Sequence, residues 1–239
     1  MSPLHQFLIH PLFSIHIWGL DLSFTNSALA MVMATALIIG LFNFGSRKKL
    51  LVPTRLQSLA EILFEFINNL ILETIGEEGR KYFPLIFSIF LFIFFGNLLG
   101  MIPYNFTFTS HIIVTFTLAV TLYTLVLFLG VSKFGFGFFK KFLPSGVPWP
   151  VAPIIIPVEI ISYFFRPVSL SIRLFANMLA GHALLKIFAS FCLIMGVFGI
   201  FPIAFNTMFI GFEVFVAGLQ AYIFTILSCV YIQDALHSH

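Results

Sequence analysis

The sequence predicts an all-α membrane protein: a single membrane domain over residues 1–239, with about five membrane helices, the last two long and steeply tilted as a hairpin, plus one interfacial amphipathic helix. Three observations lead to this class. Of the 239 residues, 60% are hydrophobic and only 9% are charged, whereas an average soluble protein is about 25% charged. The mean hydropathy is +1.07. Apolar stretches of about 20 residues, the length that a helix needs to cross the hydrocarbon core, recur along the chain. A soluble domain, a disordered tail and a nucleic-acid-binding protein are therefore excluded.

The first predicted span covers residues 27–44 and ends before the basic run Arg47-Lys48-Lys49. Residues 54–78 show a different pattern. Thr54-Arg55-Leu56-Gln57 has the form of a capping box. Apolar residues then recur at three- and four-residue steps, while Gln, Asn and Glu occupy the other face. This periodicity is typical of an amphipathic helix that lies on the membrane. Because its polar face is acidic, we expect it to dock against protein rather than against anionic lipid.

Two further spans are predicted at residues 82–102 and 111–131, and the glycines around Asn97 favour close helix contact with a buried amide. The last two apolar stretches, 150–190 and 197–236, have about 40 residues each. As helices they are about 60 Å long, twice the hydrocarbon thickness. We therefore predict two steeply tilted helices that turn at residues 196–199, with irregular geometry near prolines 157 and 167. A break at one of these prolines, or at proline 153, is the alternative.

Basic residues in the connecting segments indicate the orientation. They follow the first and third spans: Arg47, Lys48, Lys49, Arg55, Arg80 and Lys81, and then Lys133, Lys140 and Lys141. The connections near residues 103–110 and 191–200 contain no Lys or Arg. The positive-inside rule predicts an outside N-terminus and an inside C-terminus. The same distribution explains the pI of about 9.0 without a nucleic-acid partner.

Nearly all of the charge inside the predicted spans lies in the C-terminal hairpin. Its charged residues are Glu159, Arg166, Arg173, Lys186, Glu213 and Asp234, and its neutral polar companions are Asn177, His182 and Gln220. A charge at mid-bilayer costs several kcal/mol, from about 2.5 to more than 10, so such residues are functional by default. Snorkelling or a structural ion pair is the alternative, and for Arg166 and Lys186 snorkelling is an equally good interpretation. Arg173 lies mid-segment, where snorkelling is difficult.

The spacing places two polar pairs opposite each other across the hairpin. Arg173 and Gln220 are about equally distant from the predicted turn, and so are His182 and Glu213. Glu213 and Gln220 share one helical face, but Arg173 and His182 point in opposite directions at about 3.6 residues per turn. On straight helices the two pairs are not both direct contacts. Either the helix bends or water bridges one pair.

Arg173 and the His182–Glu213 pair differ in chemistry. Three small residues share the face of Arg173: Ser169, Ala176 and Ala180. Small residues let another backbone approach closely, and a guanidinium does not deprotonate in proteins. Arg173 can therefore hold a carboxylate of another chain ionised beside it. His182 and Glu213 can exchange protons near the outer side and Glu159 near the inner side. These residues predict a proton path interrupted by a fixed charge.

Residues 169–182, SLSIRLFANMLAGH, strongly resemble subunit a of the F-type ATP synthase in its mitochondrial and alphaproteobacterial branch. Residues 218–225 are similar to that family's last helix, residues 97–104 to an earlier helix, and residues 2–7 to its start. The likeness covers essentially the whole chain. Many bacterial members carry a carboxylate in place of His182 and a histidine in place of Glu213. This exchange keeps the acid–imidazole pair.

The resemblance implies a stationary proton-channel subunit with two offset half-channels. It assigns proton translocation to Arg173, Glu159, Asn177, His182, Glu213 and Gln220. Arg173 would face a rotor-ring carboxylate and separate the half-channels, with Gln220 beside it. His182 and Glu213 would line the outer half-channel together with Asn177, and Glu159 would line the inner one.

The resemblance also implies partners: a rotor ring of small two-helix subunits with a mid-membrane carboxylate, the peripheral stalk and other membrane subunits of the ATP synthase, and lipid. No cofactor, metal ion or nucleic acid is expected, and the chain has no Walker A loop for a nucleotide. A proton is favoured over sodium, because no oxygen-rich cluster for a hard cation is visible. The expected location is the mitochondrial inner membrane, with a bacterial inner membrane as the alternative. A self-contained proton-coupled secondary transporter and a purely structural subunit stay open.

Overall fold

The computed structural model describes residues 9–47, 53–102, 106–135 and 151–236, apart from positions 15, 18, 19 and 22. The motif at residues 2–7, the end of the 97–104 motif and lysines 48, 49, 140 and 141 lie outside this described part. Two short antiparallel ladders come first. β1 (Pro11–Phe13) pairs with β4 (Phe24–Thr25), and β2 (His16–Ile17) pairs with β3 (Leu20–Asp21). These strands are not among the predicted elements.

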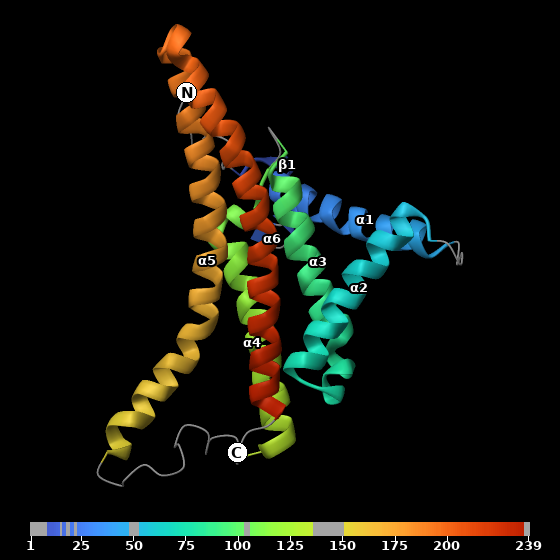
Figure 1. Cartoon of the computed structure of the whole chain (residues 1–239). Helices are drawn as coiled ribbons and strands as arrows, with labels where there is room; N and C mark the ends of the chain where they lie inside the picture. Colours follow the sequence, from blue (N-terminus) through green and yellow to red (C-terminus); the bar gives the residue numbers. More distant parts are fainter. Residues whose placement is uncertain are drawn as a thin grey trace.

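Helices make up most of the rest of the described chain (Figure 1). In chain order they are α1 (Asn26–Ser46), α2 (Arg55–Thr74), η2 (Glu77–Tyr82), α3 (Phe83–Gly100), η3 (Phe108–Ser110), α4 (Ile112–Phe134), α5 (Ala152–Ile194), η5 (Gly196–Gly199) and α6 (Ile200–Leu236). Within the described residues, five stretches are long and apolar enough to cross a membrane: 26–45, 77–100, 112–134, 153–192 and 200–236. The predicted all-α membrane fold is confirmed.

The amphipathic helix α2 begins where the sequence predicts. Thr54 Oγ1 accepts a hydrogen bond from the Gln57 backbone N–H at 3.4 Å. The Gln57 side chain does not complete the capping box but donates to Glu61 Oε1 at 2.8 Å. The helix ends at Thr74, earlier than predicted, because Gly76 has a φ of +86°, which a right-handed helix does not accommodate. One face is buried: Ala60, Ile67, Leu70 and Ile71.

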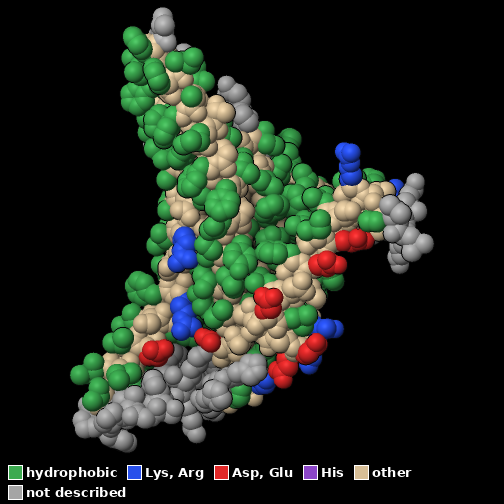
Figure 2. All heavy atoms as spheres, in the orientation of Figure 1, with side chains coloured by type: hydrophobic (Ala, Val, Ile, Leu, Met, Phe, Trp, Pro, Cys, Tyr) green, Lys and Arg blue, Asp and Glu red, His purple; other side chains and the backbone are tan. Residues whose placement is uncertain are grey.

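α1 and α2 lie to one side of the bundle that α3, α4, α5 and α6 form (Figure 1). Figure 2 shows acidic side chains following each other along the α2 arm, whereas the face over α5 and α6 is mainly hydrophobic with isolated charges. The main apolar core lies between α2, α3, α4 and α6 and includes Leu170 and Leu174 of α5. The buried Asn97 side chain of α3 donates from Nδ2 to the Ala217 carbonyl of α6 at 3.2 Å. This contact ties the C-terminal hairpin to the bundle.

The C-terminal hairpin consists of the 43-residue α5 and the 37-residue α6, joined by η5 at the predicted turn. At 1.5 Å per residue these helices are about 65 and 55 Å long, so only a strong tilt keeps them within about 30 Å of hydrocarbon. α5 is continuous through Pro157 and Pro167, and Figure 1 shows that it bends in its N-terminal part. The predicted irregularity is therefore a bend and not a break.

The bend in α5 is accompanied by a specific hydrogen bond. Pro167 has no N–H, so the carbonyl of Tyr163, one turn earlier, loses its helical donor. The Tyr123 hydroxyl of α4 donates to that carbonyl at 2.7 Å. A buried backbone acceptor that would otherwise be unsatisfied thus joins α4 to α5.

Candidate functional site

A buried acid–imidazole pair joins α5 and α6. His182 Nδ1 lies 2.7 Å from Glu213 Oε1, and both side chains are almost fully buried. The preceding residue makes room for the contact, because a Cβ on Gly181 would lie 2.5 Å from Glu213 Oε1. The sequence-predicted pair is therefore a direct contact, and a glycine on α5 is what admits the carboxylate.

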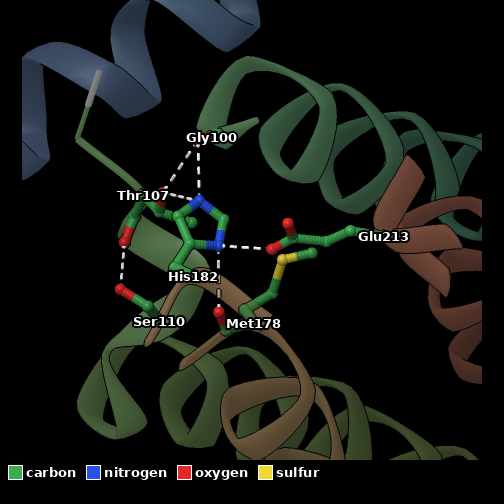
Figure 3. Close-up of polar contacts among 6 residues, drawn as sticks. All are labelled: Gly100, Thr107, Ser110, Met178, His182 and Glu213. Carbon is green, nitrogen blue, oxygen red and sulfur yellow. Dashed lines mark hydrogen bonds and ion pairs between the residues drawn. The ribbon is translucent and has the colours of Figure 1, made fainter. Parts of the chain in front are cut away.

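The surroundings of His182 fix where its protons can be (Figure 3). Nε2 lies 2.9 Å from the Gly100 carbonyl and 3.2 Å from Thr107 Oγ1. A carbonyl only accepts hydrogen bonds, so Nε2 must carry a hydrogen. Nδ1 faces both the Met178 carbonyl, at 3.0 Å, and Glu213. A hydrogen on Nδ1 therefore has two acceptors within reach, the Met178 carbonyl, to which it is hydrogen-bonded, and the Glu213 carboxylate, which is an ion-pair contact.

Thr107 belongs to a polar turn that the sequence analysis did not select. Its hydroxyl donates to the Gly100 carbonyl at 3.2 Å, and Ser110 Oγ donates to the Thr107 carbonyl at 2.6 Å. Thr107, Thr109 and Ser110 are all buried. The run of hydroxyl residues between two spans is the signal that points to this turn. It encloses the imidazole from the side opposite Glu213 (Figure 3).

Gln220 has a different neighbour from the one predicted. It is buried and accepts a hydrogen bond at Oε1 from Asn177 Nδ2 at 3.0 Å. Asn177 lies one turn beyond Arg173 on α5, so Gln220 is near the level of Arg173 while its hydrogen bond goes to the amide. Of the two predicted pairs, His182 and Glu213 are therefore in direct contact, whereas Gln220 bonds Asn177 and not Arg173. This agrees with the expectation that Arg173 and His182, on opposite faces of one helix, do not both contact α6 directly.

Arg173 lies on the open surface of the hairpin. Together with its neighbours Ser169, Ala176 and Ala180 it is exposed. Within the part of the chain that the structure describes, no hydrogen bond or ion pair involves Arg173. A cation on an otherwise apolar face, beside small side chains, can meet a carboxylate only on another chain.

Of the remaining charges of the hairpin, Glu159, Arg166 and Asp234 lie towards the end of α5 and α6 that is away from η5. Glu159 is half-buried in the N-terminal part of α5. Arg166 forms an ion pair with Asp234 of α6, with Nη1 and Oδ2 3.1 Å apart, which decides against simple snorkelling for Arg166. Lys186, closer to η5, is half-buried.

The fold and the site define a class: a multi-span helical membrane protein with a buried acid–imidazole pair and a surface cation that has no ion-pair partner among the described residues, suited to moving protons with a partner chain. Comparison with known proteins narrows the class. Residues 28–233 match the family model described as ATP synthase A chain. The chain therefore belongs to this family, the proton-channel subunits of the F0 membrane sector of ATP synthases.

Individual relatives agree over their whole length. Proteins named ATP synthase subunit a from Rhodospirillum rubrum are 49% identical over 239 residues, which cover 100% of this chain and 99% of the relative. The relative of the same name from Afipia carboxidovorans is 50% identical over 244 residues, covering 99% of this chain and 98% of the relative. That from Pelagibacter ubique is 47% identical over 240 residues, covering 100% and 98%.

Proposed function

We propose that this chain supplies two offset proton half-channels to a carboxylate on a rotor ring, and that Arg173 separates them. One observation carries the proposal: a buried proton-exchanging pair, His182–Glu213, lies 2.7 Å apart on the same two helices that present Arg173, exposed and without an ion-pair partner in the described residues. A proton path made of two separated half-channels requires a site that exchanges protons and a fixed positive charge between the half-channels, and this hairpin carries both.

The outer half-channel delivers protons through the pair. Because Nε2 is committed to the Gly100 carbonyl, the proton moves between Nδ1 and Glu213. Asn177 and Gln220, bonded to each other at 3.0 Å, lead from this pair towards the level of Arg173.

Arg173 acts as an electrostatic barrier and as the partner of the ring carboxylate. A guanidinium stays charged, so it repels a proton that would cross directly from one half-channel to the other. It also favours the ionised form of a carboxylate that passes it. The exposed small side chains beside it allow a ring helix to come close. Glu159, on the far side of the bend, serves the inner half-channel.

The partners follow from this geometry and from the family. The membrane-embedded ring lies against the exposed Arg173 face, and other F0 subunits, including the peripheral stalk, complete the assembly. The acidic exposed face of α2 suits a basic protein surface. The N-terminus lies outside and the C-terminus inside the energy-coupling membrane. The relatives compared are alphaproteobacterial, which supports a bacterial inner membrane, and a mitochondrial location stays a prediction.

The test is ATP-driven proton pumping by the assembled ATP synthase in inverted membrane vesicles. Arg173→Ala is expected to abolish pumping while the subunit still assembles. Arg80→Ala is a matched control, because Arg80 is an exposed arginine paired with Glu77 at 2.9 Å. Unchanged pumping by Arg173→Ala would favour the purely structural interpretation. Solute accumulation by proteoliposomes that hold only this chain would favour the secondary transporter.

A further inference from the structure

A second charged cluster joins α5 to α6 at the end of the hairpin away from η5. Arg166 Nη1 lies 3.1 Å from Asp234 Oδ2. The guanidinium carbon is also 5.2 Å from the ring centroid of Tyr163 and 5.5 Å from that of Tyr231, distances typical of cation–π contacts. The side chains of Arg166 and Asp234 are 28% and 37% exposed, so most of the pair is covered by the chain itself.

The aromatic neighbours of this cluster are held by the bend in α5. The Tyr123 ring lies 5.0 Å from the Tyr163 ring, and its hydroxyl bonds the carbonyl that Pro167 leaves without a helical donor. The position of Arg166 is therefore defined by three helices, α4, α5 and α6. This degree of fixation is more than a snorkelling arginine needs.

Arg166 also lies between two residues of the proposed proton path. Glu159, Arg166 and Arg173 follow one another at seven-residue spacing on α5, so they share one helical face at steps of about 10.5 Å. Glu159 belongs to the proposed inner half-channel and Arg173 to the barrier. A proton that moves between the inner side and the ring carboxylate must pass the Arg166 level.

The two arginines have opposite electrostatic surroundings. Arg173 has no counter-charge among the described residues, as its proposed role requires. Arg166 is neutralised by Asp234. The other charged groups on this face are Glu159 and Arg173 themselves, while Tyr163 and Tyr231 are neutral phenols. With an effective dielectric constant of about 20, an unpaired unit charge about 10 Å away changes the population of a proton-carrying state roughly tenfold.

We propose that Asp234 is the counter-charge that keeps Arg166 from acting as a second cationic barrier in the inner half-channel. This inference rests on the proposed function. Asp234 acts by neutralising the charge of Arg166 and does not itself carry the proton. The pair thus adds no net charge beside the inner path.

The experiment compares Asp234→Asn, Arg166→Gln and the double variant in the assembled complex. Asp234→Asn leaves Arg166 unpaired and is expected to slow ATP-driven proton pumping roughly tenfold. Arg166→Gln removes the cation and is expected to pump within about twofold of the unaltered complex, as is the double variant. Glu78→Gln is a matched control, because it removes the partner of Lys133, 3.3 Å away, from an exposed ion pair.

The asymmetry of the single variants separates charge balance from a mechanical link. Equal losses in both single variants without recovery in the double variant overturn the proposal, and so does normal pumping by Asp234→Asn. If Asp234→Asn assembles poorly, the double variant decides: pumping within about twofold of the unaltered complex supports the proposal, and a larger loss overturns it. Arg173→Ala is measured alongside. Normal coupled pumping by that variant would refute the proposed function, whatever the Asp234 variants do.

Discussion

Substitution of Gly181 by Ala tests the contact between the two proton-carrying side chains. A Cβ at this position would lie 2.5 Å from Glu213 Oε1, 2.9 Å from Cδ and 3.2 Å from Cγ. Atoms in ordinary contact are at least about 3.5 Å apart, so the carboxylate must retreat from α5 by about 1 Å. His182 lies on the same helix, and its 2.7 Å contact with Glu213 therefore lengthens beyond hydrogen-bond distance.

Separating a buried ion pair costs at least as much as losing a hydrogen bond to a charged group, about 1.5–3 kcal/mol. If the proton transfer uses this contact, the same free energy corresponds to a rate that is roughly 10- to 100-fold lower. The overpacking also costs stability, about 1–3 kcal/mol, so proton flux must be divided by the amount of assembled subunit. The assay is ATP-driven acidification of inverted vesicles, with the subunit quantified in the purified complex.

Gly211→Ala is the matched control for this substitution. It also adds one methyl group to a helix of the hairpin, but no heavy atom lies within 4 Å of the added Cβ. Its flux is expected to be unchanged. Normal flux per assembled complex in Gly181→Ala alone would show that the proton does not depend on this contact.

Two further predictions concern stability. Burial lowers the pKa of His111, just before α4, below its ordinary 6.5. The folded chain thus prefers neutral His111, and its contribution to stability is present above pH 6.5 and lost as the pH falls through the lowered pKa. His111→Phe is expected to flatten the acid side of a plot of thermal stability against pH, and an unchanged slope would contradict this. Tyr123→Phe removes the donor of a buried hydrogen bond and is expected to cost about 1–3 kcal/mol in denaturant unfolding. Tyr222→Phe is its control, and equal losses in the two variants would show that the hydroxyl is unimportant.

The sequence was a good guide to the elements that a single physical signal determines. Apolar runs located the five membrane-crossing stretches, and the 3.6-residue periodicity located α2. The glycines at residues 196 and 199 predicted the turn that forms η5. Because His182 and Glu213 are about equally far from this turn along the chain, their contact could also be predicted. These features depend on local composition or on a single register, both of which can be read along the chain.

The remaining features depend on how the helices lie relative to one another. Asn177 rather than Arg173 bonds Gln220, because helical rotation decides which of two nearby polar residues faces α6. Asp234 meets Arg166 although the two are unequally distant from the turn, and the bend of α5 is a physical reason for this shift. The Gly100 carbonyl at His182 is a backbone group of another span, for which no side-chain pattern gives a signal.

The most direct test of the central claim is passive proton conduction through the membrane sector after the ATP-hydrolysing part has been removed. With Arg173 in place, conduction should require ring rotation, and blocking rotation by a cross-link between this chain and the ring should stop it. With Arg173→Ala, protons should still cross when rotation is blocked, because nothing separates the half-channels. If the blocked Arg173→Ala sector is as proton-tight as the blocked unaltered sector, Arg173 is not the barrier.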